Sequence, residues 1–265
     1  MINIVINTKG GVGKSSVSSQ FLSAYISRKT NGTVEFYEID DQNESVKSMS
    51  ESKILKSNIV KVENVSKFVE ESILFENDVV VDVGGNITAV MFLQKLKSLG
   101  GFITPTIYFI PMFDGDQDAK NAADTFNLIR EFDKDSKIIY VLNRCTNTSN
   151  QELMEREFID FFGSDVLDVP AIIKDKNTFH IAINKNAIYN VVGKLKKTIM
   201  EVALDNYDEE YKKAALEFFA DKSNQDLYKK TRRFMFLKEQ SIIAKGILEN
   251  EYDGLFDELD RIIKK

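Results

Sequence analysis

Residues 9–16 bring together the groups that a nucleotide-phosphate site needs, directly after the apolar run of residues 2–6. They read Lys9, Gly10, Gly11, Val12, Gly13, Lys14, Ser15 and Ser16. Glycines permit left-handed φ angles, so backbone N–H groups can curl around a β-phosphate at a helix N-terminus. Lys14 supplies positive charge, and the Ser15 hydroxyl can ligate Mg²⁺. The segment predicts a phosphate-binding loop, although Thr8 replaces the first glycine of the general pattern.

The first lysine of the loop gives it a more specific resemblance. A Lys-Gly-Gly-Val-Gly-Lys-Ser run resembles the deviant Walker A motif of the ParA/MinD ATPases, which partition plasmids and chromosomes or position division sites. In that family the extra lysine, here Lys9, reaches across a nucleotide-sandwich dimer to the partner's phosphates. The resemblance implies ATP and Mg²⁺ as cofactors and a homodimer that forms with ATP. An exposed loop lysine is the alternative role of Lys9.

The segment after residues 34–39 resembles the switch I of that family. Asp40 stands where relatives have the aspartate that helps to position the attacking water, so the resemblance implies a catalytic role beside Lys9 and Lys14. Glu38 replaces the usual first aspartate and Asp41 the usual proline. Hydrolysis is therefore less securely implied than nucleotide binding. An N-cap for the next helix is the alternative role of Asp40 and Asp41.

The strand predicted at residues 78–83 carries the third part of the resemblance. Asp82 resembles the Walker B aspartate, a second-shell partner of Mg²⁺ and its waters. Gly85 stands at the end of an Asp-x-x-Gly switch II, where a backbone N–H can sense the γ-phosphate. Many relatives have proline in this region, and Gly84 with Gly85 makes the segment more flexible here.

Two further positions match the family's base-binding segments. Asn143 ends a predicted strand where relatives place an asparagine whose amide contacts adenine. Pro170 lies in Val169-Pro170-Ala171, which resembles the segment lining the other side of the base. The resemblance as a whole covers residues 1 to about 204.

Composition excludes several related functions. One cysteine, Cys145, permits no intrachain disulfide, which favours a reducing cytoplasm, and cannot hold an iron–sulfur cluster. His180 has no cysteine or carboxylate at ligand spacing, so we expect an ordinary helix residue. No run approaches the about 20 apolar residues of a membrane span.

Alternating strand and helix patterns predict an α/β fold, a mostly parallel twisted sheet with helices on both faces. The predicted strands are residues 2–6, 33–39, 58–62, 78–83, 102–110, 136–142 and 166–169. The predicted helices include residues 15–29, 188–204, 208–221, 224–248 and 252–264. Since strand patterns cease near residue 204, we expect an ATPase domain at 1–204 and a helical C-terminal extension at 205–265.

Two basic clusters are candidate DNA contacts on this acidic chain of net charge −6. The first, the 194–197 lysines, consists of Lys194, Lys196 and Lys197. The second, the 229–233 cluster, consists of Lys229, Lys230, Arg232 and Arg233. A solvated helix turn with its apolar face on the ATPase domain is the alternative for the second cluster. The terminal helix is amphipathic but too acidic for anionic lipids, so we expect it to pack on other helices and not on a membrane.

The resemblance predicts an ATP-dependent dimeric ATPase for plasmid partition or DNA segregation, cycling between an ATP-bound dimer on DNA and an ADP-bound monomer. Its expected partners are nonspecific DNA and a small DNA-binding adaptor that stimulates hydrolysis, and the nucleoid is a further expected location. Two alternatives stay open. One is a MinD-like or conjugation-associated positioning ATPase, and the other is a nucleotide-gated binding module with negligible turnover.

Overall fold

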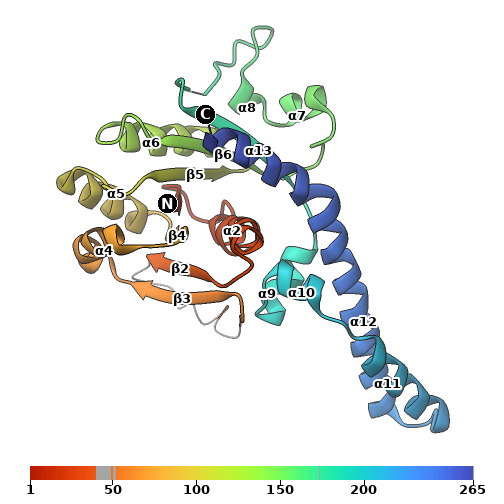
Figure 1. Ribbon diagram of the computed structural model, residues 1–265. Coiled ribbons are helices and arrows are strands. Elements are labelled where there is room, and N and C mark those ends of the chain that lie inside the picture. Colours follow the sequence, from red (N-terminus) through yellow and green to blue (C-terminus); the bar gives the residue numbers. More distant parts are fainter. Residues whose placement is uncertain (40–48, 50–51, 173, 265) are drawn as a thin grey trace.

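The computed structural model describes residues 1–39, 49, 52–172 and 174–264 (Figure 1). Their core is a seven-stranded parallel sheet with the order β3-β2-β4-β1-β5-β6-β7. The strands are β1 (Ile2–Val5), β2 (Val34–Ile39), β3 (Leu55–Val60), β4 (Val79–Val83), β5 (Thr106–Met112), β6 (Lys137–Cys145) and β7 (Thr178–Asn184). Every residue of β1, β4 and β5 is buried, because helices cover both faces of the sheet.

One face of the sheet is covered by five helices and two short helical turns. They are η2 (Val62–Asn64), α4 (Val65–Glu71), η3 (Ser72–Leu74), α5 (Ile87–Leu99), α6 (Asp116–Arg130), α7 (Gln151–Glu157) and α8 (Ile159–Phe162). Phe68, Phe92, Phe126 and Phe161 of these helices are buried in one core with side chains of the strands.

The opposite face is covered by helices from both ends of the chain. The N-terminal ones form a continuous run of α1 (Lys14–Ser16), the π-helical η1 (Val17–Leu22) and α2 (Ser23–Thr30). The C-terminal ones are α9 (Ile188–Leu195), α10 (Ile199–Leu204), the end of α12 (Gln225–Ile247), η4 (Leu248–Tyr252) and α13 (Asp253–Lys264). Phe256, Leu259 and Ile262 of α13 are buried in the same core as Phe21 of η1. The terminal helix therefore packs on other elements, as the sequence predicts.

The helix α11 (Asp208–Ala220) packs against the first part of α12, and this pair projects away from the sheet (Figure 1). The three helices predicted beyond residue 204 are thus confirmed. The boundary predicted at residue 204 stays a prediction, and α13 returns to the core of the sheet. In the part of the chain that is described, no helix has the length and apolar content of a membrane span.

The fold class is confirmed, but the last predicted strand is wrong. Residues 165–168 form a turn in which Asp168 has a φ of 54°, and Ser164 pairs antiparallel with Val169 across it. The seventh strand is β7, so His180 lies on a strand and not on the predicted helix. Burial and the nearby Lys174 charge lower the pKa of His180, whose ring packs edge-on against Phe162. The strands predicted at 58–62 and 102–110 are displaced by a few residues, to β3 and β5.

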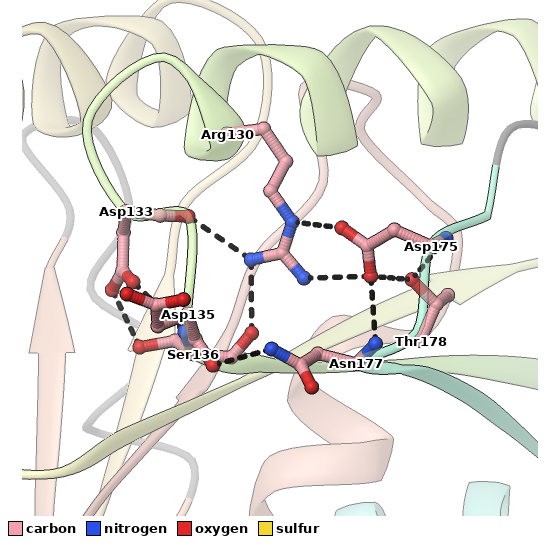
Figure 2. Close-up of polar contacts among 7 residues, drawn as sticks. All are labelled: Arg130, Asp133, Asp135, Ser136, Asp175, Asn177 and Thr178. Carbon is pink, nitrogen blue, oxygen red and sulfur yellow. Dashed lines mark hydrogen bonds and ion pairs between the residues drawn. The ribbon is translucent and has the colours of Figure 1, made fainter.

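A polar cluster fixes the start of β7 (Figure 2). Arg130, at the end of α6, makes a two-pronged ion pair with Asp175 and donates to the backbone carbonyls of Asp133 and Ser136. Asp175 also accepts hydrogen bonds from Thr178 Oγ1 and the Asn177 backbone. The cluster lies at the N-terminal ends of β6 and β7, and it joins both strands to α6.

Candidate functional site

The loop between β1 and α1 has the backbone of a phosphate-binding loop. Gly11 and Gly13 have φ angles of 79° and 87°, which L side chains rarely adopt. A Cβ on Gly13 would also lie 2.0 Å from Asn143 Nδ2. The N–H of Val17 donates to the carbonyl of Gly13, so the loop leads directly into the helix. N–H groups at this helix start can therefore face an anion.

Lys14 is buried within the loop, with 7% of its surface exposed. Its Nζ donates to the Lys9 carbonyl at 2.9 Å, which brings its charge to the centre of the curl. Gly85 lies directly beside it: a Cβ there would be 2.8 Å from Gly10 Cα and 3.0 Å from Lys14 Nζ. Only glycine fits at position 85 without displacing the loop.

Three side chains brace the loop: one at its own start, one just before α5 and one on α6. The Gly10 N–H donates to Asn86 Oδ1, and the Thr8 N–H donates to Thr125 Oγ1 on α6. Asn7 Oδ1 accepts from the Lys9 N–H at 2.8 Å. The sequence analysis missed these bracing residues, since Asn86 and Thr125 lie far along the chain from their partners, and an asparagine just before a loop is common.

A cavity of about 170 Å³ adjoins the helix start and carries the oxygen atoms that a divalent cation needs. Ser15, Glu38 and Asp82 line it. Glu38 and Asp82 are each 5% exposed and lie opposite each other in the pairing of β2 with β4. Two buried carboxylates side by side are stabilised by a cation between them. Carboxylate and hydroxyl oxygens suit Mg²⁺, whose remaining positions waters and phosphates usually fill, so these residues fit the metal.

The position of Glu38 at the candidate cation site was also missed by the sequence analysis. It entered the sequence analysis as a departure from the family's switch I, whereas the strand register puts it across from Asp82. In the described part of the chain, no three His, Cys, Asp or Glu side chains group as a metal cage. The candidate cation site thus combines two carboxylates with a hydroxyl, and a phosphate would have to complete it.

Lys9 is held within its own chain. Its Nζ lies 2.8 Å from Asp118 Oδ2 on α6, with 35% of the lysine side chain and 12% of the aspartate side chain exposed. The other oxygen, Asp118 Oδ1, is buried and accepts no hydrogen bond from the described residues. A lysine that reaches a second chain must first leave this carboxylate.

The remaining predicted nucleotide contacts have mixed positions. Asn143 is buried at 6% exposure, and its Nδ2 donates to the Val12 carbonyl at 3.1 Å, so its amide supports the phosphate loop. Pro170 is exposed on the segment between α8 and β7. Asp40 and Asp41 lie outside the described residues.

Cys145 is buried at the end of β6, and burial raises the pKa of its thiol to about 11.

The 194–197 lysines lie at the end of α9 and just beyond it. Lys194 and Lys196 are exposed. Lys197 is half-buried, with its Nζ 2.6 Å from Asp205 Oδ2. Its charge is therefore partly neutralised within the chain.

The 229–233 cluster lies on the part of α12 that projects with α11 (Figure 1). Lys230 pairs with Glu217 of α11 at 2.7 Å. Arg232 and Arg233 are exposed, and neither makes an ion pair with a described residue. These two arginines are the cluster's most available cations.

A scan against protein-family models finds no match, and a search of curated proteins finds none either. Among solved structures, the chain is similar to a provisionally named plasmid partition protein from Borrelia burgdorferi B31, bound to AMPPNP. The two share 15% sequence identity with a TM-score of 0.47, over 83% of this chain and 98% of that chain. Similarity at this level does not show what the present chain binds.

Proposed function

We propose that this protein is a Mg²⁺-dependent ATPase of the ParA/MinD type that dimerises with ATP and takes part in DNA partition. The observation that carries the proposal is the phosphate loop with its neighbours. Left-handed Gly11 and Gly13, buried Lys14, and the cavity lined by Ser15 and Asp82 lie at one edge of the sheet. Ligands bind at this edge in open α/β sheets, where the carboxyl ends of the strands meet.

Each side chain then has a role that its position supports. Lys14 and the loop N–H groups, from Gly10 to Ser16, bind phosphates. Ser15 would hold Mg²⁺ through its hydroxyl, and the carboxylates of Asp82 and Glu38 would stabilise the charge of the ion and its waters. The Gly85 N–H senses the γ-phosphate, since Gly85 lies so close to the loop and the Lys14 ammonium that a Cβ would not fit between them. Bound Mg²⁺ would neutralise phosphate charge that develops during hydrolysis.

The first test removes the buried cation. Lys14→Ala should lower ATP affinity about 10- to 150-fold, because charged hydrogen bonds to phosphate contribute about 1.5–3 kcal/mol. Isothermal calorimetry measures this affinity with Mg²⁺ present. Lys120→Ala is the control, since that lysine forms a surface pair with Asp116 on α6. Undiminished affinity in Lys14→Ala would refute the phosphate site.

The second test separates nucleotide binding from dimerisation. Lys9→Ala should still bind ATP but fail to dimerise, because Lys9 would contact the partner's nucleotide. Asp40→Ala should dimerise and keep its ATP, because Asp40 would position the attacking water. Light scattering with ATP measures the dimer, and phosphate release measures turnover. Normal dimerisation of Lys9→Ala would exclude the cross-dimer role.

The nucleotide-gated binding module is the second candidate function, and Glu38 is the observation that favours it. A glutamate across from Asp82 has a longer arm than the usual aspartate, and this changes the space near the γ-phosphate. ATP turnover with and without duplex DNA distinguishes the two: the ATPase hydrolyses ATP faster with its partners, and the binding module stays inactive in both. Lipid vesicles in a third reaction test the positioning ATPase.

A further inference from the structure

The free edge of the sheet at β7 lies in a groove between helices. β7 is last in the strand order, and among the described strands it pairs with β6 alone. Two cavities of about 320 and 500 Å³ adjoin it and share His180 and Glu258. Gln151 and Met154 of α7 line one side, and η4 and α13 line the other. The edge is thus the floor of a groove with two helical walls.

Alternate backbone groups of β7 point into this groove. The Asn177 carbonyl accepts from Ile138 of β6, and the Lys185 N–H donates to the Cys145 carbonyl at the other end of the pairing. Odd-numbered residues therefore face β6. Since a strand has a period of two, the N–H and C=O groups of His180 and Ala182 face outward. No hydrogen bond from these groups to the rest of the described chain is present.

The β7 edge also lacks the features that usually block strand pairing. Native edges carry lysine, proline or bulges against unwanted partners. β3, at the opposite edge, carries Lys56, which is 61% exposed. β7 has the sequence TFHIAIN, with no proline or acidic residue and no lysine or arginine. Arg130 and Asp175 hold the start of β7 in place, so the strand is already ordered for pairing with a further strand (Figure 2).

The charge of the groove indicates the chemistry of its occupant. Glu251 and Glu258 line the cavity of about 320 Å³, whose described lining includes no lysine or arginine, and neither makes an ion pair with a described residue. The cavity of about 500 Å³ has Arg261 and Lys264 beside Glu258, so the acidic part of the groove is the part next to Ala182. Burial raises the pKa of Glu258 despite the nearby Arg261 charge. A partly buried carboxylate is stabilised by a cation brought to it. On the α7 side, Gln151 and the mostly buried Met154 line the cavity.

We propose that this groove binds an extended basic segment of a partner protein, which adds to β7 as an eighth strand. Its backbone pairs with His180 and Ala182, lysines on one face meet Glu251 and Glu258, and β-branched side chains on the other face meet the α7 wall. Strand addition to a sheet edge obtains affinity from main-chain hydrogen bonds and specificity from alternate side chains. The helical walls on both sides admit a single chain better than the edge of a second domain.

The probe is a capped peptide, Thr-Val-Lys-Val-Lys-Val-Thr, with lysines on one face and valines on the other. Titration should show saturable binding, and amide exchange should slow at His180 and Ala182, whose N–H groups gain partners. The amides of Ile181 and Ile183 serve as internal controls, because they already face β6. Peptides with glutamate for lysine, or proline for the central valine, should bind at least about fivefold more weakly.

Two variants test the two halves of the contact. Ala182→Pro removes one outward N–H and should abolish binding, while the fold persists because edge strands tolerate proline at such positions. Glu258→Gln should weaken the peptide about fivefold, the effect of one charge-assisted contact. Asp257→Asn is the matched control, since Asp257 is exposed on α13 and does not line the groove. If Ala182→Pro fails to fold, the peptide affinity of Glu258→Gln relative to Asp257→Asn still tests the proposal.

Several outcomes would overturn the proposal. Absence of binding at 1 mM peptide, about the weakest affinity of biological interest, is one. Equal affinity of Glu258→Gln and Asp257→Asn, or unchanged exchange at His180 and Ala182, is another. If the wild type dimerises without peptide and Ala182→Pro prevents it, the occupant is a second copy of the chain.

Discussion

Arg130→Ala will test what holds the edge strand of the sheet in place (Figure 2). The Arg130 side chain is 12% exposed, and its Nε and Nη2 lie 2.6 and 3.3 Å from the two Asp175 oxygens. Its Nη1 donates to the carbonyls of Asp133 and Ser136 at 3.0 and 2.9 Å. One guanidinium therefore joins the end of α6, the turn after it and the segment before β7.

The expected loss of unfolding free energy follows from these contacts. Breaking a fully buried ion pair costs about 3–5 kcal/mol. Asp175 is 36% exposed and keeps its hydrogen bonds from Thr178 and Asn177, so the charge left behind stays partly solvated. The two carbonyls that lose a donor add about 0.5–1.5 kcal/mol each before water replaces it. We expect a net loss of about 2–3 kcal/mol, or about 4–10 °C in the unfolding midpoint.

Urea unfolding monitored by circular dichroism measures this loss against a matched control. Arg156→Ala removes an arginine that is 71% exposed and pairs with Glu152 one helical turn away. That change should cost less than about 0.5 kcal/mol. Equal losses in the two variants would show that the cluster contributes no more than a surface pair.

The pH dependence provides a second readout of the same cluster. Partial burial raises the pKa of Asp175, but hydrogen bonds from Arg130, Thr178 and Asn177 outweigh it, and the net pKa is lowered. A carboxyl group whose pKa is lowered on folding stabilises the fold at pH values above its unfolded pKa of about 4. This stability is lost as pH falls through the folded pKa. The loss on acidification should be smaller in Arg130→Ala than in the wild type.

Three further predictions concern the nucleotide site and its partners. Gly85→Ala should weaken ATP about tenfold in calorimetry, because the new Cβ displaces Gly10 or Lys14 Nζ, and an unchanged affinity would show that the loop moves freely. Asp118→Asn should strengthen the ATP-dependent dimer about fivefold in light scattering, because Lys9 then leaves a neutral partner, and a weaker dimer would contradict this. DNA binding should require ATP and ignore sequence. Removing one phosphate contact from the 194–197 lysines or the 229–233 cluster should flatten the slope of log affinity against log salt concentration by about 1. In a dimer with both copies engaged, the change should be about 2. Unaltered slopes for both clusters would exclude both from the DNA surface.

The phosphate loop and the central strands could be predicted from sequence because their signals are local. The glycine spacing of residues 10–13 specifies the loop, and continuous β-branched runs such as residues 79–81 specify buried parallel strands. β7 has a weaker pattern, since Thr178–Asn184 includes a histidine, an alanine and an asparagine. The run before Pro170 is more apolar but turns back on itself at Asp168.

The contacts that complete the site could not be predicted, because each depends on the register of distant segments. Glu38 and Asp82 are 44 residues apart in the chain and meet through the pairing of β2 with β4. Lys9 and Asp118 meet because α6 begins beside the loop. No local pattern marks Asp118 as a partner, since an acidic residue in the first turn of a helix is ordinary. The resemblance identified the loop residues but not what holds them.

The two ends of the sheet make the two proposals separable by experiment. The phosphate loop lies at the carboxyl ends of the strands, whereas Arg130 and Asp175 lie at the amino ends of β6 and β7. Arg130→Ala should therefore leave ATP affinity unchanged while it loosens β7 and weakens the basic peptide about fivefold or more, because a strand that frays must be ordered before it can pair. Calorimetry with each ligand on the same folded sample measures both. Loss of ATP affinity together with the peptide would mean that the two ends are coupled through the sheet, and a fully retained peptide affinity would mean that the edge needs no support from Arg130.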